Sequence, residues 1–472
     1  LYCEAMTDNA YTKQPNDFTQ NIGNGSYSTA DSYVKQVWDG RYTGIRMCNQ
    51  LLENIDRVPD LDPELKKRYI GEAKVLRAYS YYELYTKFGD IPYTTKVLSI
   101  KESMSIARTA KATVIANVLA DLDEVINGNY LPTSYDADNK GRITRWAAMA
   151  IKAKIYLFEG NWTQVKNITS TIMTEGGFKL FGSYAGLFEI ANEYNSEVIL
   201  DAQYRPTSRE HQMMYVFLPP TLGGYSQLSP LQELVDSYIM LDGKTIKETG
   251  TSFDESHPYA NRDPRLKATV MYTGNSYTLA DGTEVVINCE KGEGKDGYGV
   301  GSDCSATGYY IKKYWDNTYR ATLYSGLNPI LIRYADILLM NAEALAELGE
   351  LDKTAWDATI KPIRDRAGFT LASAVEFPEG ASKDKLIEIV RNERRSELAL
   401  EGHRHKDIIR WRIADNVLNG WCHGLKTNDV VGTDDGYVRV ENRTFNANRH
   451  YLWPIPQAER DLNGNLEQNP NW

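Results

Sequence analysis

The chain has 472 residues, of which 42% are apolar and 25% are charged, and its 63 acidic residues outnumber its 53 basic ones to give a formal net charge of −10. This composition excludes a disordered chain, a collagen and a small disulfide scaffold, and the acidic balance argues against a nucleic-acid partner. The longest apolar runs, Trp146–Ile151 and Met213–Leu218, are six residues long, whereas a membrane-spanning helix needs about 20.

The first part of the sequence has the periodicity of amphipathic helices. Apolar residues recur every three or four positions, which places them on one helix face. One of these helices begins at Asp62-Pro63-Glu64, a typical helix start, and is ended by Gly89 and Pro92. The predicted helices cover Tyr33–Arg57, Asp62–Lys87, Thr113–Asn127, Thr144–Gly160 and Trp162–Thr174.

Residues 178–332 have a different character. Gly, Pro, Tyr and Asn are frequent there, and turn signals such as Asp281-Gly282 separate short runs of strand-forming residues. Strands are predicted at Glu197–Gln203, Thr283–Asn288 and Tyr309–Lys313. Helical periodicity then returns at Tyr334–Gly349, Thr354–Ala367 and Ser382–Glu401, and the sequence is irregular after Gly402.

The helices form pairs that resemble tetratricopeptide repeats. In two pairs a Gly turn is followed by an early aromatic residue of the second helix, Gly160 by Trp162 and Gly349 by Trp356. A generic helical bundle is the alternative. We divide the chain into an N-terminal helical part (1–177), a loop-rich ligand-binding region (178–332) and a C-terminal part with a helix pair, a long helix and an irregular tail (333–472), within one compact unit.

The sequence contains no motif that is specific for a catalytic activity. The sequence lacks GxSxG, HExxH, P-loop and GxGxxG patterns. His403 and His405 form the one His cluster, but Arg404 and Lys406 beside them would repel a metal ion. A carboxylate pair for glycoside hydrolysis stays open, because two acids need only meet in space. The acids considered for it are Asp8, Asp236, Asp242, Asp254 and Asp263.

The five cysteines do not pair evenly, and none lies in a CxxC motif. Cys289 and Cys304 lie in a Gly-rich stretch where a local disulfide is possible, and the sequence leaves open whether it forms. A zinc site is disfavoured because no His accompanies these cysteines at ligand spacing.

With catalytic and metal sites disfavoured, the sequence favours a surface that binds a ligand. The sequence contains 32 Tyr, whose rings stack on the apolar faces of sugars while acids, amides and Arg bind the hydroxyls. Aromatic residues gather in three loops, Asn21–Tyr33, Thr221–Ser229 and Gly297–Arg320. Packing beneath the loops is the alternative for each ring.

The run Arg391–Glu397 alternates in charge and is interpreted as an ion-pair network on a helix face.

Ordered motifs along nearly the whole chain resemble the SusD/RagB family of outer-membrane nutrient-binding lipoproteins from Bacteroidetes. The matching segments are Arg68–Ala78, Phe88–Pro92, Gly141–Thr144, Asn195–Ile199, Asn261–Leu266, Arg333–Met340, Arg391–Arg395, Leu398–Gly402, Trp411, Pro454–Gln457 and Asn465–Pro470.

The resemblance implies an all-α fold, in which tetratricopeptide-like helix pairs form a scaffold that carries a long, loop-rich, partly β insertion. It also implies a protein without catalytic activity or cofactor. Such a protein binds a glycan at the outward face of the outer membrane and acts as the lid of a SusC-like TonB-dependent transporter. Family members are anchored by a lipidated N-terminal Cys, and we expect that segment to precede the first residue of this chain.

Five residues are predicted to bind ligand from their positions in the family's pattern. Tyr27 lies in the loop where a starch-binding member carries a Trp that stacks on the sugar. Because this chain has Tyr in place of that Trp, the identity of the glycan is left open. Asp8 falls at an acidic binding position, Trp315 and Arg320 lie in a stretch that resembles another part of the site, and Tyr225 lies in a variable loop. Arg77, Arg333 and Glu393 are expected to be structural, because we assign them to scaffold helices. The alternatives are a binder of peptides or another nutrient on the same fold, and a glycoside hydrolase.

Overall fold

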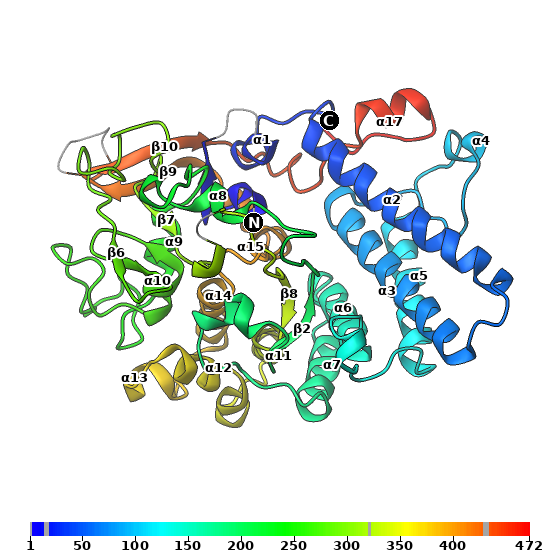
Figure 1. Cartoon of the computed structure of the whole chain (residues 1–472), viewed down its shortest axis with the longest axis horizontal. Helices are drawn as coiled ribbons and strands as arrows, with labels where there is room; N and C mark the ends of the chain where they lie inside the picture. Colours follow the sequence, from blue (N-terminus) through cyan, green and yellow to red (C-terminus); the bar gives the residue numbers. More distant parts are fainter. Residues whose placement is uncertain (1, 14–17, 320–321, 428–433) are drawn as a thin grey trace. The chain divides into compact units, whose positions relative to one another are not determined.

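The computed structural model describes residues 2–13, 18–319, 322–427 and 434–472 (Figure 1). The chain forms two compact units: unit 1 comprises residues 1–24, 177–408 and 416–444, and unit 2 comprises 25–176, 409–415 and 445–472. This division differs from the three consecutive parts drawn from composition. Residues 1–24 belong to unit 1 because the strand Ala10–Thr12 pairs with Leu228–Pro230.

Unit 2 is built from helices that pack on their neighbours in the sequence. Its helices are α2 (Ser32–Asn54), α3 (Pro63–Phe88), α4 (Ile100–Ser103), α5 (Lys111–Asn127), α6 (Arg145–Phe158), α7 (Trp162–Glu175) and α17 (Gln457–Leu462), with 3₁₀ turns at Ile55–Arg57 and Ala137–Asn139. Helix α2 packs on α3, α3 on α5, α5 on α6, and α6 on α7. These stacked helix pairs are the tetratricopeptide-like arrangement that the sequence predicts.

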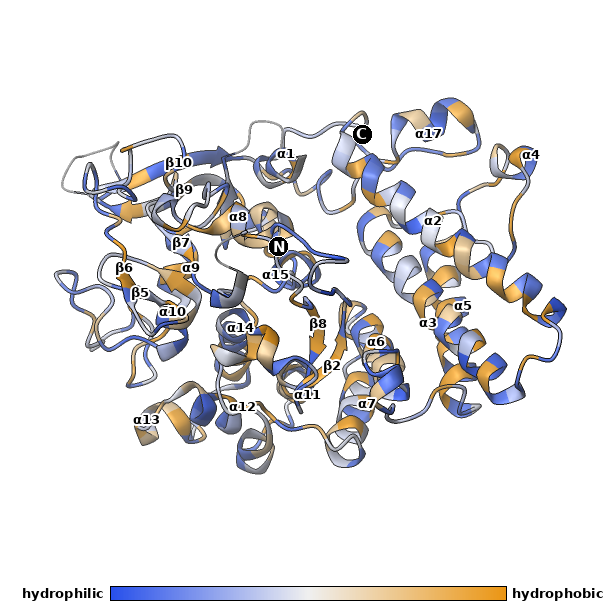
Figure 2. Ribbon diagram, in the orientation of Figure 1, coloured by the Kyte–Doolittle hydropathy of each residue, from blue (hydrophilic) through white to orange (hydrophobic). Residues whose placement is uncertain are grey.

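Local sequence explains where these helices begin and end. The carboxylate of Asp62 accepts a hydrogen bond from the Leu65 backbone N–H at 2.8 Å, which caps α3. Gly89 ends the helix with φ of 70°, a conformation that favours glycine. Figure 2 shows apolar and polar residues intermixed along the helices of unit 2. On α5, a single face is buried, formed by Val114, Val118, Leu122 and Val125.

Unit 1 combines a second helical scaffold with short strands and long loops. Its longer helices are α11 (Tyr334–Leu348), α12 (Lys353–Ala367) and α14 (Lys383–Glu397), and α11 packs on both of the others. The shorter helices are α1 (Phe18–Asn24), α8 (Met213–Phe217), α9 (Gln232–Ser237), α10 (Pro264–Thr269) and α13 (Ala372–Val375), with 3₁₀ turns at Tyr2–Met6, Gly186–Phe188, Ile190–Asn192, Pro220–Leu222 and Asn317–Tyr319. Two helices cross the boundaries of the units, α15 (Arg404–Arg410) and α16 (Ala414–Val417).

The strands described in unit 1 form five antiparallel pairs. They are β1 (Ala10–Thr12) with β3 (Leu228–Pro230), β2 (Val198–Asp201) with β8 (Ile330–Arg333), β4 (Val270–Met271) with β7 (Tyr310–Ile311), β5 (Ser276–Thr278) with β6 (Glu284–Val286), and β9 (Gly420–Lys426) with β10 (Tyr437–Arg443). The strands predicted from the sequence at 197–203, 283–288 and 309–313 correspond to β2, β6 and β7. The fold class is therefore an all-α scaffold with a loop-rich, partly β insertion, as predicted.

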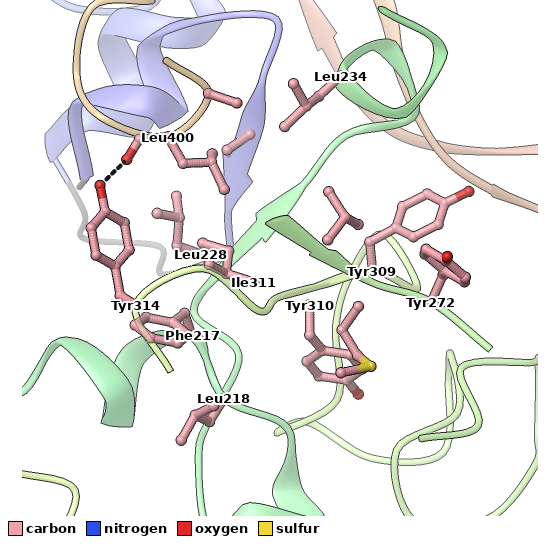
Figure 3. Close-up of a cluster of buried hydrophobic side chains, with 14 of the residues drawn as sticks. Phe217, Leu218, Leu228, Leu234, Tyr272, Tyr309, Tyr310, Ile311, Tyr314 and Leu400 are labelled. Carbon is pink, nitrogen blue, oxygen red and sulfur yellow. Dashed lines mark hydrogen bonds between the residues drawn. The ribbon is translucent and has the colours of Figure 1, made fainter. Parts of the chain in front are cut away.

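A tyrosine-rich apolar cluster forms the core beneath the loops of unit 1 (Figure 3). The hydroxyl of a buried tyrosine usually has a hydrogen-bond partner, because leaving it without one costs free energy. Tyr314 donates to the backbone oxygen of Leu400 at 2.9 Å, and Tyr277 donates to that of Ile311 at 2.8 Å. Several of the loop tyrosines therefore pack in this core, which is the alternative that the sequence left open for them.

A buried ion-pair network connects the elements of unit 1. Arg333, at the end of β8, is 1% exposed. Its guanidinium donates to the carboxylates of Glu197, Glu397 and Glu401 at 2.6 to 2.8 Å. The same three acids receive further hydrogen bonds from Arg366, Arg265 and Lys313.

The predicted ion-pair network of Arg391–Glu397 is present, but most of its partners lie on other elements rather than along α14. Glu393 binds Arg265 of α10 at 2.7 Å and Arg364 of α12 at 2.7 Å. Arg394 binds Asp336 of α11 and Asp407. Burial of these side chains excludes water from the pairs, so each charge depends on its partners.

The described part of the chain has no helix that is both long and apolar enough to span a bilayer.

Replacement of Arg333 by Ala should strongly destabilise the protein. The substitution leaves Glu197, Glu397 and Glu401 short of a buried cation, which typically costs 3–5 kcal/mol, so we expect a loss of about that size. Urea unfolding of the variant measures it. Lys353→Ala is the control, because Lys353 forms exposed pairs with Asp357 and Glu376 and its loss should change the midpoint little. Equal shifts in both variants would contradict a special role of the buried network.

Acid should destabilise the protein partly through Glu401. Burial raises the pKa of this carboxyl, but Arg333 and Lys313 outweigh burial and lower its pKa from 4.5 to about 2. Because the folded pKa is depressed, its stabilisation is complete above about pH 4.5 and is lost as the pH falls toward about 2. The free energy of unfolding, measured by urea titration across this range, should fall more steeply for the wild type than for Glu401→Gln. Identical pH dependence of the two proteins would exclude this contribution.

Candidate functional site

Three tyrosines, two exposed and one half-buried, gather around α8 in unit 1. An isolated β-bridge joins His211 to Ser325, with backbone hydrogen bonds of 2.9 Å in both directions. This bridge brings the residues after His211 next to those before Ser325, although they are far apart in the sequence. Gln212 donates a hydrogen bond to the hydroxyl of Tyr324.

Tyr215 and Tyr225 lie with their ring centroids 4.4 Å apart at an interplanar angle of 49°. The pKa of Tyr215 is raised, first by its hydrogen bond with Tyr225, then by burial and by the nearby Tyr225, Tyr324 and Asp303. We call Tyr215, Tyr225 and Tyr324 the tyrosine platform. Tyr225 is 36% exposed and Tyr324 is 43% exposed, so ring surface is open to solvent. Open rings beside amide and carboxylate groups suit the stacking of a sugar and the binding of its hydroxyls.

Trp315 is half-buried at the edge of the unit 1 core. Its indole Nε1 donates to the backbone oxygen of Thr278 at 2.9 Å, and its ring meets that of Tyr277 at a centroid distance of 5.1 Å. These contacts fix the orientation of the indole and cover part of its surface. Its role in ligand binding stays a prediction.

Asp8 is buried in an ion-pair cluster. Its carboxylate accepts two hydrogen bonds of 2.8 Å from Arg404 and lies 3.0 Å from Arg395. Burial raises the pKa of this carboxyl, but the two guanidiniums outweigh burial and hold the pKa below its usual range. Asp8 also lines a cavity of about 440 Å³, with Asp236, Lys247, Asn392 and Trp421. With its oxygens already bound by two arginines, Asp8 has little acceptor capacity left for a ligand.

Tyr27 lies in unit 2 and is packed rather than displayed. The side chain is 3% exposed, and its ring meets those of His450 and Trp472 at 5.2 and 4.8 Å. Burial raises the pKa of its hydroxyl. A sugar would have to displace these rings to stack on Tyr27. Of the five predicted residues, Tyr225 is the one that joins an exposed cluster in the described structure, and Arg320 lies outside the described residues.

The sequence did not single out Tyr215 or Tyr324. Tyr215 lies within the apolar run Met213–Leu218, which resembles a buried segment, and Tyr324 follows a stretch without a local motif. The signal that unites them is the His211–Ser325 bridge, which only the folded chain shows.

Two further expectations concern cysteines and metals. The described cysteines are free, and Cys289 and Cys304 are both buried without a disulfide. Burial raises the pKa of the Cys289 thiol, which keeps it protonated. Within the described residues, no group of three or more His, Cys, Asp and Glu is arranged to hold a metal ion.

Comparison with known proteins identifies the family. The profile of the SusD family matches residues 187–472, and a second profile, described as starch-binding associating with outer membrane, matches residues 1–157. The chain belongs to the SusD family. Solved structures that resemble this chain are SusD-like proteins with the same kind of helical, tetratricopeptide-like fold.

Relatives of this SusD-family chain resemble it over most of its length. SusD-like protein P25 of Formosa agariphila is 28% identical over 410 residues, which cover 82% of this chain and 71% of that protein. A SusD-like carbohydrate binding protein from Bacteroides fragilis has 29% identity and a TM-score of 0.88, over 98% of this chain and 92% of that chain. A second SusD-like protein from Bacteroides fragilis has 27% identity and a TM-score of 0.85, over 100% and 93%.

The motif residues of the SusD-family chain that we expected to be structural lie in ion pairs. Arg77 of α3 binds Asp121 at 2.6 Å and Asn49 at 2.8 Å within unit 2. Arg333 and Glu393 belong to the buried network of unit 1. Arg333, however, ends a strand rather than lying on a scaffold helix.

Tyr27→Ala should destabilise the protein, because it removes a buried ring that packs on His450 and Trp472. Large aromatic truncations of this kind cost about 3–5 kcal/mol, and Tyr27→Phe, which keeps the ring, should cost less than about 1 kcal/mol. Thermal unfolding of both variants measures this. Unchanged stability of Tyr27→Ala together with lost ligand binding would instead assign Tyr27 to the binding surface.

Proposed function

We propose that this SusD-family chain binds a glycan without catalysis at the outward face of the outer membrane and delivers it to a SusC-like TonB-dependent transporter, which it covers as a lid. The tyrosine platform carries this proposal, because it presents the exposed rings of Tyr225 and Tyr324, the first packed on Tyr215. The description of the Bacteroides fragilis relative as carbohydrate binding supports glycan as the ligand class. The profile matched by residues 1–157 supports association with the outer membrane.

The roles of lid and lipid anchor rest on the family resemblance. A lid that delivers its cargo must release it, so moderate affinity at the platform suits this role. A polymer that meets several bound chains gains avidity without tighter individual contacts. Aromatic stacking serves peptides as well as sugars, so a peptide or another nutrient is the alternative that the test must separate.

The first experiment is native affinity electrophoresis against plant, host and microbial polysaccharides. We expect at least one of them to retard the wild-type chain, and we expect Tyr225→Ala and Tyr324→Ala to reduce the affinity about tenfold each, which corresponds to about 1.4 kcal/mol. The reason is that each substitution removes an exposed ring from the platform.

Tyr130→Ala is the matched control, since Tyr130 lies in unit 2 and its hydroxyl binds Glu124. Its retardation should equal that of the wild type. An assay for new reducing ends on the retarding polysaccharide should stay flat, and the chain should co-purify with a SusC-like transporter. Steady release of reducing ends would favour the hydrolase instead, and binding of peptides without any glycan would overturn the proposed ligand class.

A further inference from the structure

A second cavity lies in unit 1 beside the hairpin of β9 and β10, and its lining residues differ from those of the tyrosine platform. Its volume is about 810 Å³, within the range of cavities that hold small organic ligands. The lining residues used below are Gln232, Asp236, Tyr259, Arg262, Tyr309 and Tyr437. We call it the hairpin cavity.

The aromatic wall of the hairpin cavity is held rigidly. Tyr259 stacks on Tyr272 with ring centroids 4.0 Å apart and planes 17° apart. Its hydroxyl lies 3.2 Å from the hydroxyl of Tyr309, which donates to Oε1 of Gln232 at 2.6 Å. Rings fixed in this way lose little conformational freedom when a ligand binds. Tyr437, on the hairpin itself, is half-buried and adds a further ring.

Asp236 supplies unused acceptor capacity in this cavity. Its Oδ1 accepts a hydrogen bond from Gln232 at 2.7 Å, and the described residues give its side chain no other hydrogen bond. A carboxylate has room for about four donors. Burial raises the pKa of Asp236. Arg262 does not bind it, because the guanidinium donates to the backbone oxygens of Val235, Pro258 and Tyr238.

The charges of the cavity favour a neutral ligand. The acids Asp236, Glu255, Glu290 and Glu293 line it together with Arg262, Lys291 and Lys426. Since the donors of Arg262 are spent on backbone oxygens, an anionic sugar would meet the partly buried charge of Asp236 without a free guanidinium to bind it. A neutral sugar offers the hydroxyl donors that Asp236 lacks and an apolar face for the tyrosines.

The walls of the cavity favour the end of a chain over its middle. Two rings of the platform, Tyr225 and Tyr324, are exposed, so a polymer can pass across them, whereas Tyr259 and Tyr437 are half-buried and Tyr309 is buried. An exposed ion pair of 3.3 Å between Lys426 and Glu255 links the hairpin to the loop before Tyr259. Exposed pairs of this kind contribute little stability, so the contact can open for a ligand.

We propose that the hairpin cavity is a second carbohydrate site, which takes the terminal residues of a neutral glycan through Asp236 and the rings of Tyr259 and Tyr437. The inference rests on the proposed function, because it assumes that the chain binds glycans. It adds a site for chain ends to the platform.

Isothermal titration with neutral hexasaccharides of the malto-, laminari-, xylo- and manno- series tests the second site. The wild type should bind two molecules of at least one of them. Asp236→Asn and Tyr437→Ala should each weaken one of the two sites about tenfold and leave the other unchanged. Asp138→Asn is the matched control, because Asp138 is an exposed acid in unit 2. Thermal unfolding checks that both cavity variants fold, and Asp236→Asn keeps the shape of the side chain.

The double variant Tyr225→Ala, Tyr324→Ala separates this inference from the proposed function. If it retains one hexasaccharide, which Asp236→Asn then weakens, the second site is supported. A single wild-type site that only the double variant removes would overturn the second site while the proposed function stands. Binding of none of the hexasaccharides, or binding of peptides in the cavity, would overturn the inference as well.

Discussion

Unit 1 depends on the pairing of one buried carboxylate, that of Glu397, with three arginines. This carboxylate accepts hydrogen bonds from Arg265, Arg333 and Arg366, which lie on α10, β8 and α12. A buried carboxylate is tolerated only when such partners compensate its lost hydration. The pairing therefore requires that a strand and two helices meet α14 at one point. The segment between residues 197 and 333 begins and ends at this point, since Glu197 and Arg333 bind each other within the network.

The proposed binding surface lies on loops of unit 1, and the ion-pair network holds together the scaffold that carries them. The residues around α8 contact β3, and the His211–Ser325 bridge joins them to the segment that leads into β8. Binding residues commonly lie on loops of this kind, because the scaffold supplies order while the loops supply variety. Tyrosine suits such a surface, since its ring offers a large contact area with few rotatable bonds.

Sequence patterns predicted the scaffold because helices depend on nearby residues. The helix expected at Thr113–Asn127 is α5, and the one expected at Ser382–Glu401 is α14, which ends at Glu397. That early end has a physical cause, since Leu400 adopts a positive φ of 62° and Glu401 turns into the ion network. The site was less predictable. The burial of Tyr27 depends on His450 and Trp472, and the pairing of Asp8 depends on Arg395 and Arg404, which local sequence cannot reveal.

The pairing of β1 with β3 has a consequence for how the chain acquires its structure. Helices α2 to α7 find their partners next in the sequence, so their contacts can form early and quickly. Strand β1 has to wait until Leu228–Pro230 has been synthesised, and Asp8 waits longer still for Arg395 and Arg404. Until then the first residues of unit 1 carry an unpaired strand and an uncompensated acid. We therefore expect unit 1 to complete its assembly late, when its later residues pack around the N-terminal segment that was synthesised first.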